Sequence, residues 1–216
     1  MNVEKIVKIK NVSKKFKETE VLKNISVEFE NGKIYGIVGR NGSGKSVLFK
    51  TLCGFISIEE GEIWIRGKKL GKDMDVPSDV GIIIDSSGFL PYYSGKKNLK
   101  FLASLNRKIG IKEIDETMLK VGLDPNSKKH VSKYSLGMRQ RLSIAQAIME
   151  NQDIIILDEP MNGLDKNGVN DIRNILLGLK KDGKTLFLAS HNTEDIKILC
   201  DEVYEMESGT LIKIEN

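Results

Sequence analysis

Short apolar segments recur along the first 85 residues and again after residue 152, and their pattern predicts β-strands. Some of these segments alternate apolar with polar side chains, and others are rich in β-branched residues, as strands usually are. The segment 80–84 is apolar enough to be buried on both faces of a sheet. Strands are expected at residues 3–12, 25–29, 34–38, 63–65, 80–84, 153–157 and 185–189.

Between residues 86 and 151 the pattern changes to the helical period, for example with Met138, Leu142, Ala145 and Met149 on one side of a helix. Helices are expected at residues 45–53, 98–105, 114–121, 137–149, 169–179 and 194–199, and a final hairpin at 202–207 and 210–214. The sequence therefore predicts one α/β domain over residues 1–216. Its strand–helix core, 1–85 and 152–216, is interrupted by a helical subdomain at 86–151.

The composition fits a globular domain, with 40% apolar and 30% charged residues. Lysine and arginine number 34 against 30 acidic residues, and the basic residues are scattered as doublets between acidic neighbours. A groove for nucleic acid needs a concentrated basic stripe, and the sequence shows none, so we expect no nucleic-acid partner.

Two features of the chain indicate a cytosolic protein. Cys53 and Cys200 lie in apolar surroundings without metal-ligand spacing, which suits a reducing compartment. Apolar runs such as 82–84 and 154–157 are far shorter than the roughly 20 residues of a spanning helix. If the function involves a membrane, another chain must cross it.

A phosphate-binding loop stands between a predicted strand and a predicted helix. It is formed by Gly39, Arg40, Asn41, Gly42, Ser43, Gly44, Lys45 and Ser46. Glycines let backbone N–H groups approach phosphate oxygens, and the start of the helix directs further N–H groups and its dipole at the same anion. Lys45 offers a charge to the β- and γ-phosphates, Ser46 offers a hydroxyl to Mg²⁺, and we include the next residue, Val47, in the nucleotide-binding set. An accidental glycine-rich turn is the alternative, and the strand and helix around the loop make it negligible.

The apolar strand at 153–157 ends in two adjacent carboxylates, Asp158 and Glu159. If this strand ends beside the phosphate loop, Asp158 contributes to the Mg²⁺ site and Glu159 faces the attacking water as general base. A core strand running into a charged turn is the alternative, and a complete phosphate loop upstream argues against it.

Three further motifs carry a family resemblance. Residues 134–142 read Tyr-Ser-Leu-Gly-Met-Arg-Gln-Arg-Leu, residues 162–165 read Asn-Gly-Leu-Asp, and Ser190-His191 follows a strand. With the two motifs above, the chain resembles the nucleotide-binding subunit of an ATP-binding-cassette (ABC) transporter from Phe16 to His191.

The resemblance implies a P-loop NTPase core with an antiparallel β edge and an inserted α-helical subdomain. It also implies Mg²⁺-dependent hydrolysis of ATP and a head-to-tail dimer that sandwiches two ATP molecules. A transmembrane permease subunit is the implied partner, which would hold the chain on the cytoplasmic, inner face of the cell membrane.

The family motifs assign further residues of this chain by resemblance. Phe16 matches the aromatic that stacks on adenine, with a core side chain as the alternative. Ser135 and Gly137 match the signature that contacts the γ-phosphate of the opposite subunit, although Tyr134, Leu136 and Met138 depart from the usual spelling, Leu-Ser-Gly-Gly-Gln.

The two remaining matches lie after the predicted base. Asp165 matches the loop residue that links the two sites across the dimer, and His191 matches the histidine that senses the γ-phosphate. His130 has no such context and is assigned no role.

Asp85 stands where most of the family has a glutamine that contacts Mg²⁺ and water, so its carboxylate is expected to bind Mg²⁺ or position the water, with a surface turn residue as the alternative. An acidic residue here, followed by Gly88-Phe89-Leu90-Pro91, resembles the subgroup that exports antimicrobial peptides such as lantibiotics and bacitracin, although that subgroup usually has glutamate. The aromatic residues at 88–93 either dock the membrane subunit, as in the family, or pack inside the helical subdomain.

Two other classes remain alternatives. A soluble ABC-type ATPase usually shows two cassettes, a long coiled-coil insert or basic extensions, and the sequence has none of these. A switch GTPase needs a guanine-reading Asn-Lys-x-Asp segment, which is missing, and it would leave Glu159 and the signature unexplained.

Overall fold

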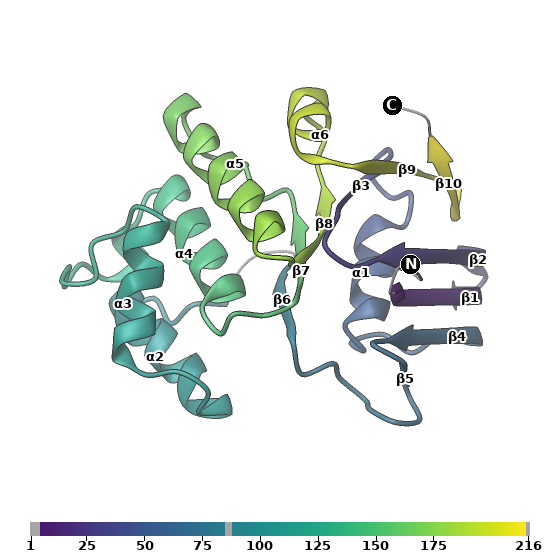
Figure 1. Cartoon of the computed structure of the whole chain (residues 1–216), viewed down its shortest axis with the longest axis horizontal. Helices are drawn as coiled ribbons and strands as arrows, with labels where there is room; N and C mark the ends of the chain where they lie inside the picture. Colours follow the sequence, from purple (N-terminus) through teal and green to yellow (C-terminus); the bar gives the residue numbers. More distant parts are fainter. Residues whose placement is uncertain (1–4, 85–87, 215–216) are drawn as a thin grey trace.

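The computed structural model describes residues 5–84 and 88–214 and contains two β-sheets with helices packed against them (Figure 1). The smaller sheet is antiparallel and has the strand order β2-β1-β4-β5. Its strands are β1 (Lys5–Phe16), β2 (Thr19–Glu30), β4 (Glu60–Ile65) and β5 (Lys68–Lys69).

The larger sheet has the strand order β10-β9-β3-β8-β7-β6. Its strands are parallel except for β10, which pairs antiparallel with β9. They are β3 (Ile34–Val38), β6 (Val80–Ile83), β7 (Ile154–Asp158), β8 (Thr185–Ala189), β9 (Glu202–Glu207) and β10 (Thr210–Ile214). Every residue of β8 is buried, because layers cover both faces of this sheet.

Helix α1 (Lys45–Leu52) lies between the two sheets (Figure 1). The core there is aromatic: the ring of Phe29 meets those of Tyr35 and Phe187 edge-on at centroid distances of 4.8 and 4.9 Å. Alternate residues of β7 and β8 point to the opposite face, where α5 (Lys166–Lys181) and α6 (Thr193–Leu199) complete a second core. The larger sheet thus lies between two packed layers.

The chain between β6 and β7 is mainly helical and lies to the left in Figure 1. It comprises α2 (Gly95–Asn106), α3 (Ile111–Lys120), a 3₁₀ turn (Val131–Lys133) and α4 (Leu136–Ile148). Helix α4 joins this part to the sheet, since a Cβ at Gly81 of β6 would lie 1.8 Å from the carbonyl oxygen of Ala147. Only glycine permits that approach of helix to strand.

The expected α/β class is confirmed, and the differences concern the ends of elements. Helices α2, α3 and α5 begin three residues earlier than the apolar period indicated, because their starts are defined by caps. Ser94 caps α2, Asp165 caps α5, and the carboxylate of Glu113 accepts from the backbone of Gly110 before α3. The short strand β5 and the 3₁₀ turn were not expected from the sequence.

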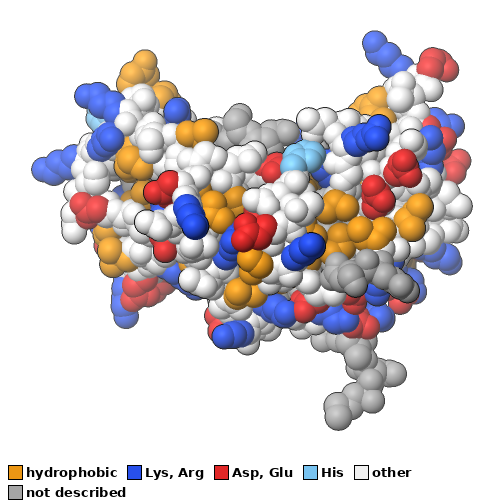
Figure 2. Space-filling model, turned by 90° about the horizontal axis from the view of Figure 1, so that it is seen from above, with side chains coloured by type: hydrophobic (Ala, Val, Ile, Leu, Met, Phe, Trp, Pro, Cys, Tyr) orange, Lys and Arg blue, Asp and Glu red, His pale blue; other side chains and the backbone are white. Residues whose placement is uncertain are grey.

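Basic and acidic side chains are interspersed on the face seen in Figure 2, with apolar side chains exposed between them. Within residues 5–84 and 88–214, no helix has both the length and the apolar character that crossing a membrane would need.

Candidate active site

The phosphate-binding loop connects the end of β3 to the start of α1, as expected from the sequence. Its three glycines have positive φ angles: 144° at Gly39, 79° at Gly42 and 116° at Gly44. A Cβ at Gly39 would lie 2.3 Å from the carbonyl oxygen of Met206 in β9, and one at Gly44 would lie 2.9 Å from that of Val21 in β2. Both sheets therefore press on the loop and hold it in a form that only glycine adopts easily.

Two side chains of the loop are suited to bind an anion. Lys45 is buried, and its Nζ donates to the carbonyl oxygens of Gly39 (2.6 Å) and Arg40 (3.1 Å), which folds the ammonium group over the loop. The Oγ of Ser43 is buried without a hydrogen-bond partner among the described residues. Such an orphan group indicates a missing polar ligand, and the N-terminus of α1 beside it favours phosphate.

The end of β7 meets the same loop. The hydroxyl of Ser46 donates to Oδ2 of Asp158 at 2.7 Å, which joins the first turn of α1 to β7. A hydroxyl and a carboxylate are the hard oxygen ligands that Mg²⁺ prefers. In the described part of the chain no three His, Cys, Asp or Glu side chains gather as a metal cage. Two oxygen ligands fit Mg²⁺, which is usually held by one or two protein groups and substrate phosphates.

Glu159 follows Asp158 and faces His191, which follows β8. The Nε2 of His191 lies 3.4 Å from Oε1 of Glu159, an oxygen that is buried and has no hydrogen bond from any described residue. Burial raises the pKa of Glu159, and the neighbouring His191 opposes that rise. A carboxylate with a free, buried oxygen at a strand end is suited to accept a proton from water.

These groups line one hollow of about 210 Å³. Nine of the residues expected from the sequence line it: Asn41, Gly42, Gly44, Lys45, Ser46, Val47, Asp158, Glu159 and His191. Arg40 and Gly39 lie beside it, on a neighbouring hollow that His191 also lines. The structure thus gathers the loop, the carboxylate pair and the histidine at the same ends of β3, β7 and β8.

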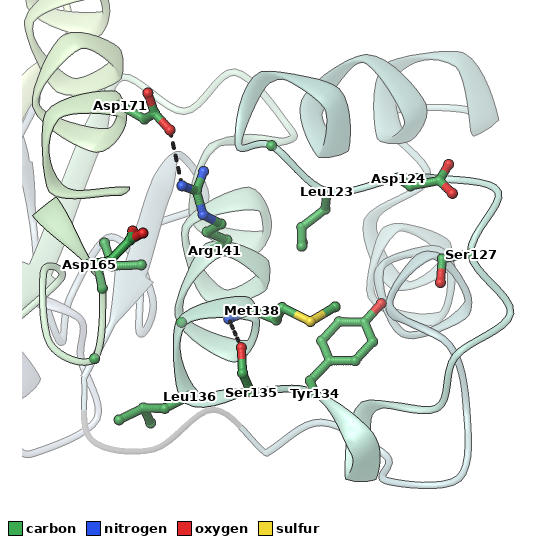
Figure 3. Close-up of a pocket in the computed structure, with 14 residues that line it drawn as sticks. Leu123, Asp124, Ser127, Tyr134, Ser135, Leu136, Met138, Arg141, Asp165 and Asp171 are labelled. Atoms are coloured by element: carbon green, nitrogen blue, oxygen red, sulfur yellow. Dashed lines mark hydrogen bonds and ion pairs between the residues drawn. The ribbon is translucent and has the colours of Figure 1, made fainter. Parts of the chain in front are cut away.

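Ser135, Gly137 and Asp165 line a different and larger hollow, of about 840 Å³ (Figure 3). Ser135 caps α4 by accepting from the backbone N–H of Met138 at 3.2 Å, and Asp165 caps α5 by accepting from that of Gly168 at 2.9 Å. Neither residue lines the hollow that contains Lys45. Ser135, Gly137 and Asp165 therefore lie outside the hollow of their own chain's phosphate loop.

Phe16 ends β1 and is 45% exposed, so the alternative of a core side chain is wrong. The Nζ of Lys14 lies 5.2 Å from the centre of its ring. The ring is thus open to a stacking partner, although it does not line the hollow of the phosphate loop.

The structure divides the aromatic residues at 88–93. Phe89 packs partly against the core, whereas Tyr92 is 77% exposed. Tyr93 meets Phe101 edge-on, and Lys97 lies over the ring of Tyr93 at 4.3 Å. Asp85 lies outside the described residues, so its place in the Mg²⁺ site stays a prediction.

One contact of the site was missed. The side chain of Gln140, on α4, donates to the backbone carbonyl oxygens of Glu159 and Pro160. Gln140 belongs to the segment 134–142 that carried the family resemblance, but its bond to a backbone group leaves no pattern in the sequence.

The fold and the site together define a nucleotide-binding cassette. The profile of the family described as ABC transporter matches residues 22–162, and the chain belongs to that family. It is the ATP-binding subunit of a transporter and an ATPase, as its sequence indicated.

Among its relatives, the uncharacterised ABC transporter ATP-binding protein YybJ of Bacillus subtilis is 46% identical over 95% of this chain and 94% of that protein. The bacitracin transport ATP-binding protein BcrA of Enterococcus faecalis is 36% identical over 100% of this chain and 71% of that protein. The lantibiotic transport ATP-binding protein SrtF of Streptococcus pyogenes is 32% identical over 96% and 89%.

Solved structures agree on the fold. A dimeric bacterial ABC transporter cassette, MJ0796, superposes with a TM-score of 0.85 at 24% identity, over 97% of this chain and 99% of that one. The protein cbiO1 of Clostridium perfringens, part of the ABC transporter complex cbiONQ, gives 0.82 at 28% identity, over 97% and 87%.

Proposed function

We propose that this chain is the Mg²⁺-dependent ATP-hydrolysing subunit of an exporter and drives a peptide or antibiotic through a separate transmembrane permease. The observation that carries the proposal is the single hollow that joins Lys45, the Ser46–Asp158 pair and Glu159 with His191. Each motif by itself has a structural alternative, but their convergence at the ends of β3, β7 and β8 favours a catalytic site.

The contacts support a role for each of these groups. The N–H groups of residues 39–46 bind the phosphates, and Lys45 turns from the carbonyl groups of Gly39 and Arg40 to the β- and γ-phosphate oxygens. Ser46 and Asp158 would hold Mg²⁺, which neutralises phosphate charge when bound. Glu159 takes the proton of the attacking water, and His191 beside it contacts the γ-phosphate.

The second hollow supports a head-to-tail dimer. Ser135 and Gly137 stand at the N-terminus of α4, where phosphate binds well, yet they lie outside the hollow of their own phosphate loop. They would contact the ATP of a second subunit, with Asp165 linking the two sites and Phe16 stacking on adenine.

Export of a peptide or antibiotic is suggested by the relatives named for bacitracin and lantibiotic transport. An apolar surface is available to a permease. It consists of the exposed rings of Tyr92, Tyr93 and Phe101, together with Leu105, which is on α2 with Phe101. We further propose that residues 86–151 form a helical subdomain inserted in the core of 1–85 and 152–216. Asp85 would couple this subdomain to the Mg²⁺ site. The permease would hold the chain on the inner face of the membrane.

Hydrolysis of ATP and GTP by the purified chain, with Mg²⁺ or with a chelator, tests the chemistry. We expect Mg²⁺-dependent ATP hydrolysis that Lys45→Ala abolishes and that Lys181→Ala, at an exposed lysine on α5, leaves unchanged. A preference for GTP would contradict the proposal.

Purification from detergent-solubilised membranes tests the partner. A co-purifying permease supports the exporter, and a chain free of membrane subunits favours the soluble ABC-type ATPase.

A further inference from the structure

The side chain of Gln140, on α4, contacts the backbone of Glu159, the proposed base. Its Nε2 lies 2.9 Å from the carbonyl oxygen of Pro160 and 3.3 Å from that of Glu159. An amide NH₂ group has two hydrogens, so one side chain satisfies two consecutive carbonyl groups. This contact joins α4 to the loop that follows β7.

The backbone at Glu159 is strained and needs such support. Its φ angle is 51°, in the left-handed region that residues with a Cβ rarely occupy. A strained residue of this kind persists only where its surroundings fix it. The N–H of Glu159 donates to Ala189 at 2.9 Å, and its carbonyl oxygen accepts from Asn162 at 3.2 Å within the same turn. Gln140 restrains the same backbone further from α4, which lies outside the pair of β7 and β8.

The beginning of α4 touches the same loop. A Cβ at Gly137 would lie 3.0 Å from the carbonyl oxygen of Gly163, and the side chain of Leu136 lies over Gly163 itself. Helix α4 therefore contacts the loop near Glu159 through Gln140 and again at Gly163. The helix that Ser135 caps is in this way joined to the loop that contains Glu159.

We infer that Gln140 is a positioning residue for hydrolysis: its amide holds the peptide of Glu159 so that the carboxylate faces the attacking water. The inference rests on the proposed function, because it needs Glu159 as the base. Gln140 itself touches neither ATP nor water in this role. It acts on turnover rather than on binding of the nucleotide.

Two substitutions of similar size separate positioning from packing. Gln140→Met keeps the length of the side chain and removes the donors, and we expect kcat to fall about threefold to tenfold. Gln140→Glu keeps the shape, but at pH 8 an ordinary carboxylate is ionised and faces two carbonyl oxygens, so kcat should fall further. The KM for ATP should change less than about twofold in both, because binding uses other groups.

The matched control is Gln146→Met. Gln146 is also half-buried on α4, and within the described parts of the chain its side chain makes no hydrogen bond. Its kcat should equal that of the wild type. Thermal melting of all variants checks the fold, and if Gln140→Met does not fold, the comparison of Gln140→Glu with the wild type decides.

Full activity of Gln140→Met would overturn the inference. Better activity of Gln140→Glu than of Gln140→Met would also overturn it, because a side chain that only fills space tolerates glutamate, the closer isostere of glutamine. These results leave the proposed function standing, because the wild type still hydrolyses ATP. A wild type without ATP hydrolysis rejects the proposed function, and the inference with it.

Discussion

Two glycines of the phosphate loop differ in what surrounds them, although both have positive φ angles. A Cβ at Gly39 would press on the backbone of Met206, whereas one at Gly42 would meet nothing within 4 Å. We expect Gly42→Ala to cost about 1–2 kcal/mol of unfolding free energy from backbone strain alone. Gly39→Ala should cost about 2–5 kcal/mol, because overpacking against β9 is added to the strain.

Urea unfolding of the two variants and the wild type measures this difference. Gly39→Ala should also bind ATP more weakly, since the loop must shift away from β9. Equal stability of the two variants would show that β9 does not restrain the loop.

At the residue scale, the site could be found in the sequence where its chemistry is contiguous. The loop 39–46 and the pair Asp158 and Glu159 stand at the ends of apolar strands, and parallel strands bring such ends together. The bond from Gln140 to Glu159 could not be found, because any residue offers a backbone carbonyl. The exposure of Phe16 also depends on where its hairpin ends, which the alternation of residues does not specify.

At the scale of elements, β9 is anchored by an ionised carboxylate at its first residue. Glu202 accepts from Lys33 at 2.7 Å and from Tyr204 at 3.1 Å, and it pairs with Lys213 at 2.7 Å. Burial by itself would raise the pKa of Glu202, but the bonds from Lys213, Lys33 and Tyr204 outweigh it and lower the pKa to about 2. The interaction ties β9 to the residue before β3 and to β10.

A lowered pKa sets the direction of the pH dependence. The stabilisation is complete above about pH 4.5, the ordinary value for glutamate, and is lost as the pH falls toward 2. We expect Glu202→Gln to lower the unfolding free energy by about 2 kcal/mol at pH 7, after solvent screening of the exposed lysines. The difference from the wild type should shrink between pH 4.5 and pH 3 in urea titrations.

The exposed Glu205 of the same strand supplies a control, and Glu205→Gln should change stability little at any of these pH values. A deficit of Glu202→Gln that stays constant from pH 7 to pH 3 would contradict an ionic origin.

The elements themselves could be predicted where apolar residues define them. The buried strands β3, β7 and β8 and the central parts of the helices all carry a clear period. The first turns of α2 and α5 do not, since Ser94 and Asp165 fix those starts by capping. Strand β5 consists of two lysines that pair with Trp64 and Ile65, so its existence depends on a tertiary contact that hydrophobicity cannot indicate.

At the scale of the whole molecule, the signature residues and the phosphate loop line separate hollows. Ser135→Arg should therefore leave binding of ATP by the monomer within about twofold of the wild type. It should weaken ATP-driven dimerisation at least about tenfold, because a bulky cation blocks the N-terminus of α4. Analytical ultracentrifugation without ATP, and with ATP and a chelator that prevents hydrolysis, measures the monomer and the dimer of each variant.

Lys45→Ala is the comparison for this test, because it removes a group of the chain's own site. If Ser135→Arg lost ATP affinity as severely as Lys45→Ala, the signature would serve its own phosphate loop and the head-to-tail arrangement would be wrong.

The central claim is that Glu159 is the base of an ATPase whose dimer closes on the nucleotide. Glu159→Gln keeps the size of the side chain and removes its proton affinity, so turnover should fall about 10²–10⁴-fold while the phosphate contacts remain. The variant should then elute from gel filtration as a nucleotide-bound dimer in the presence of ATP and Mg²⁺, whereas the wild type hydrolyses its ATP and elutes as a monomer. Turnover by Glu159→Gln close to that of the wild type, with no dimer accumulating, would contradict the account.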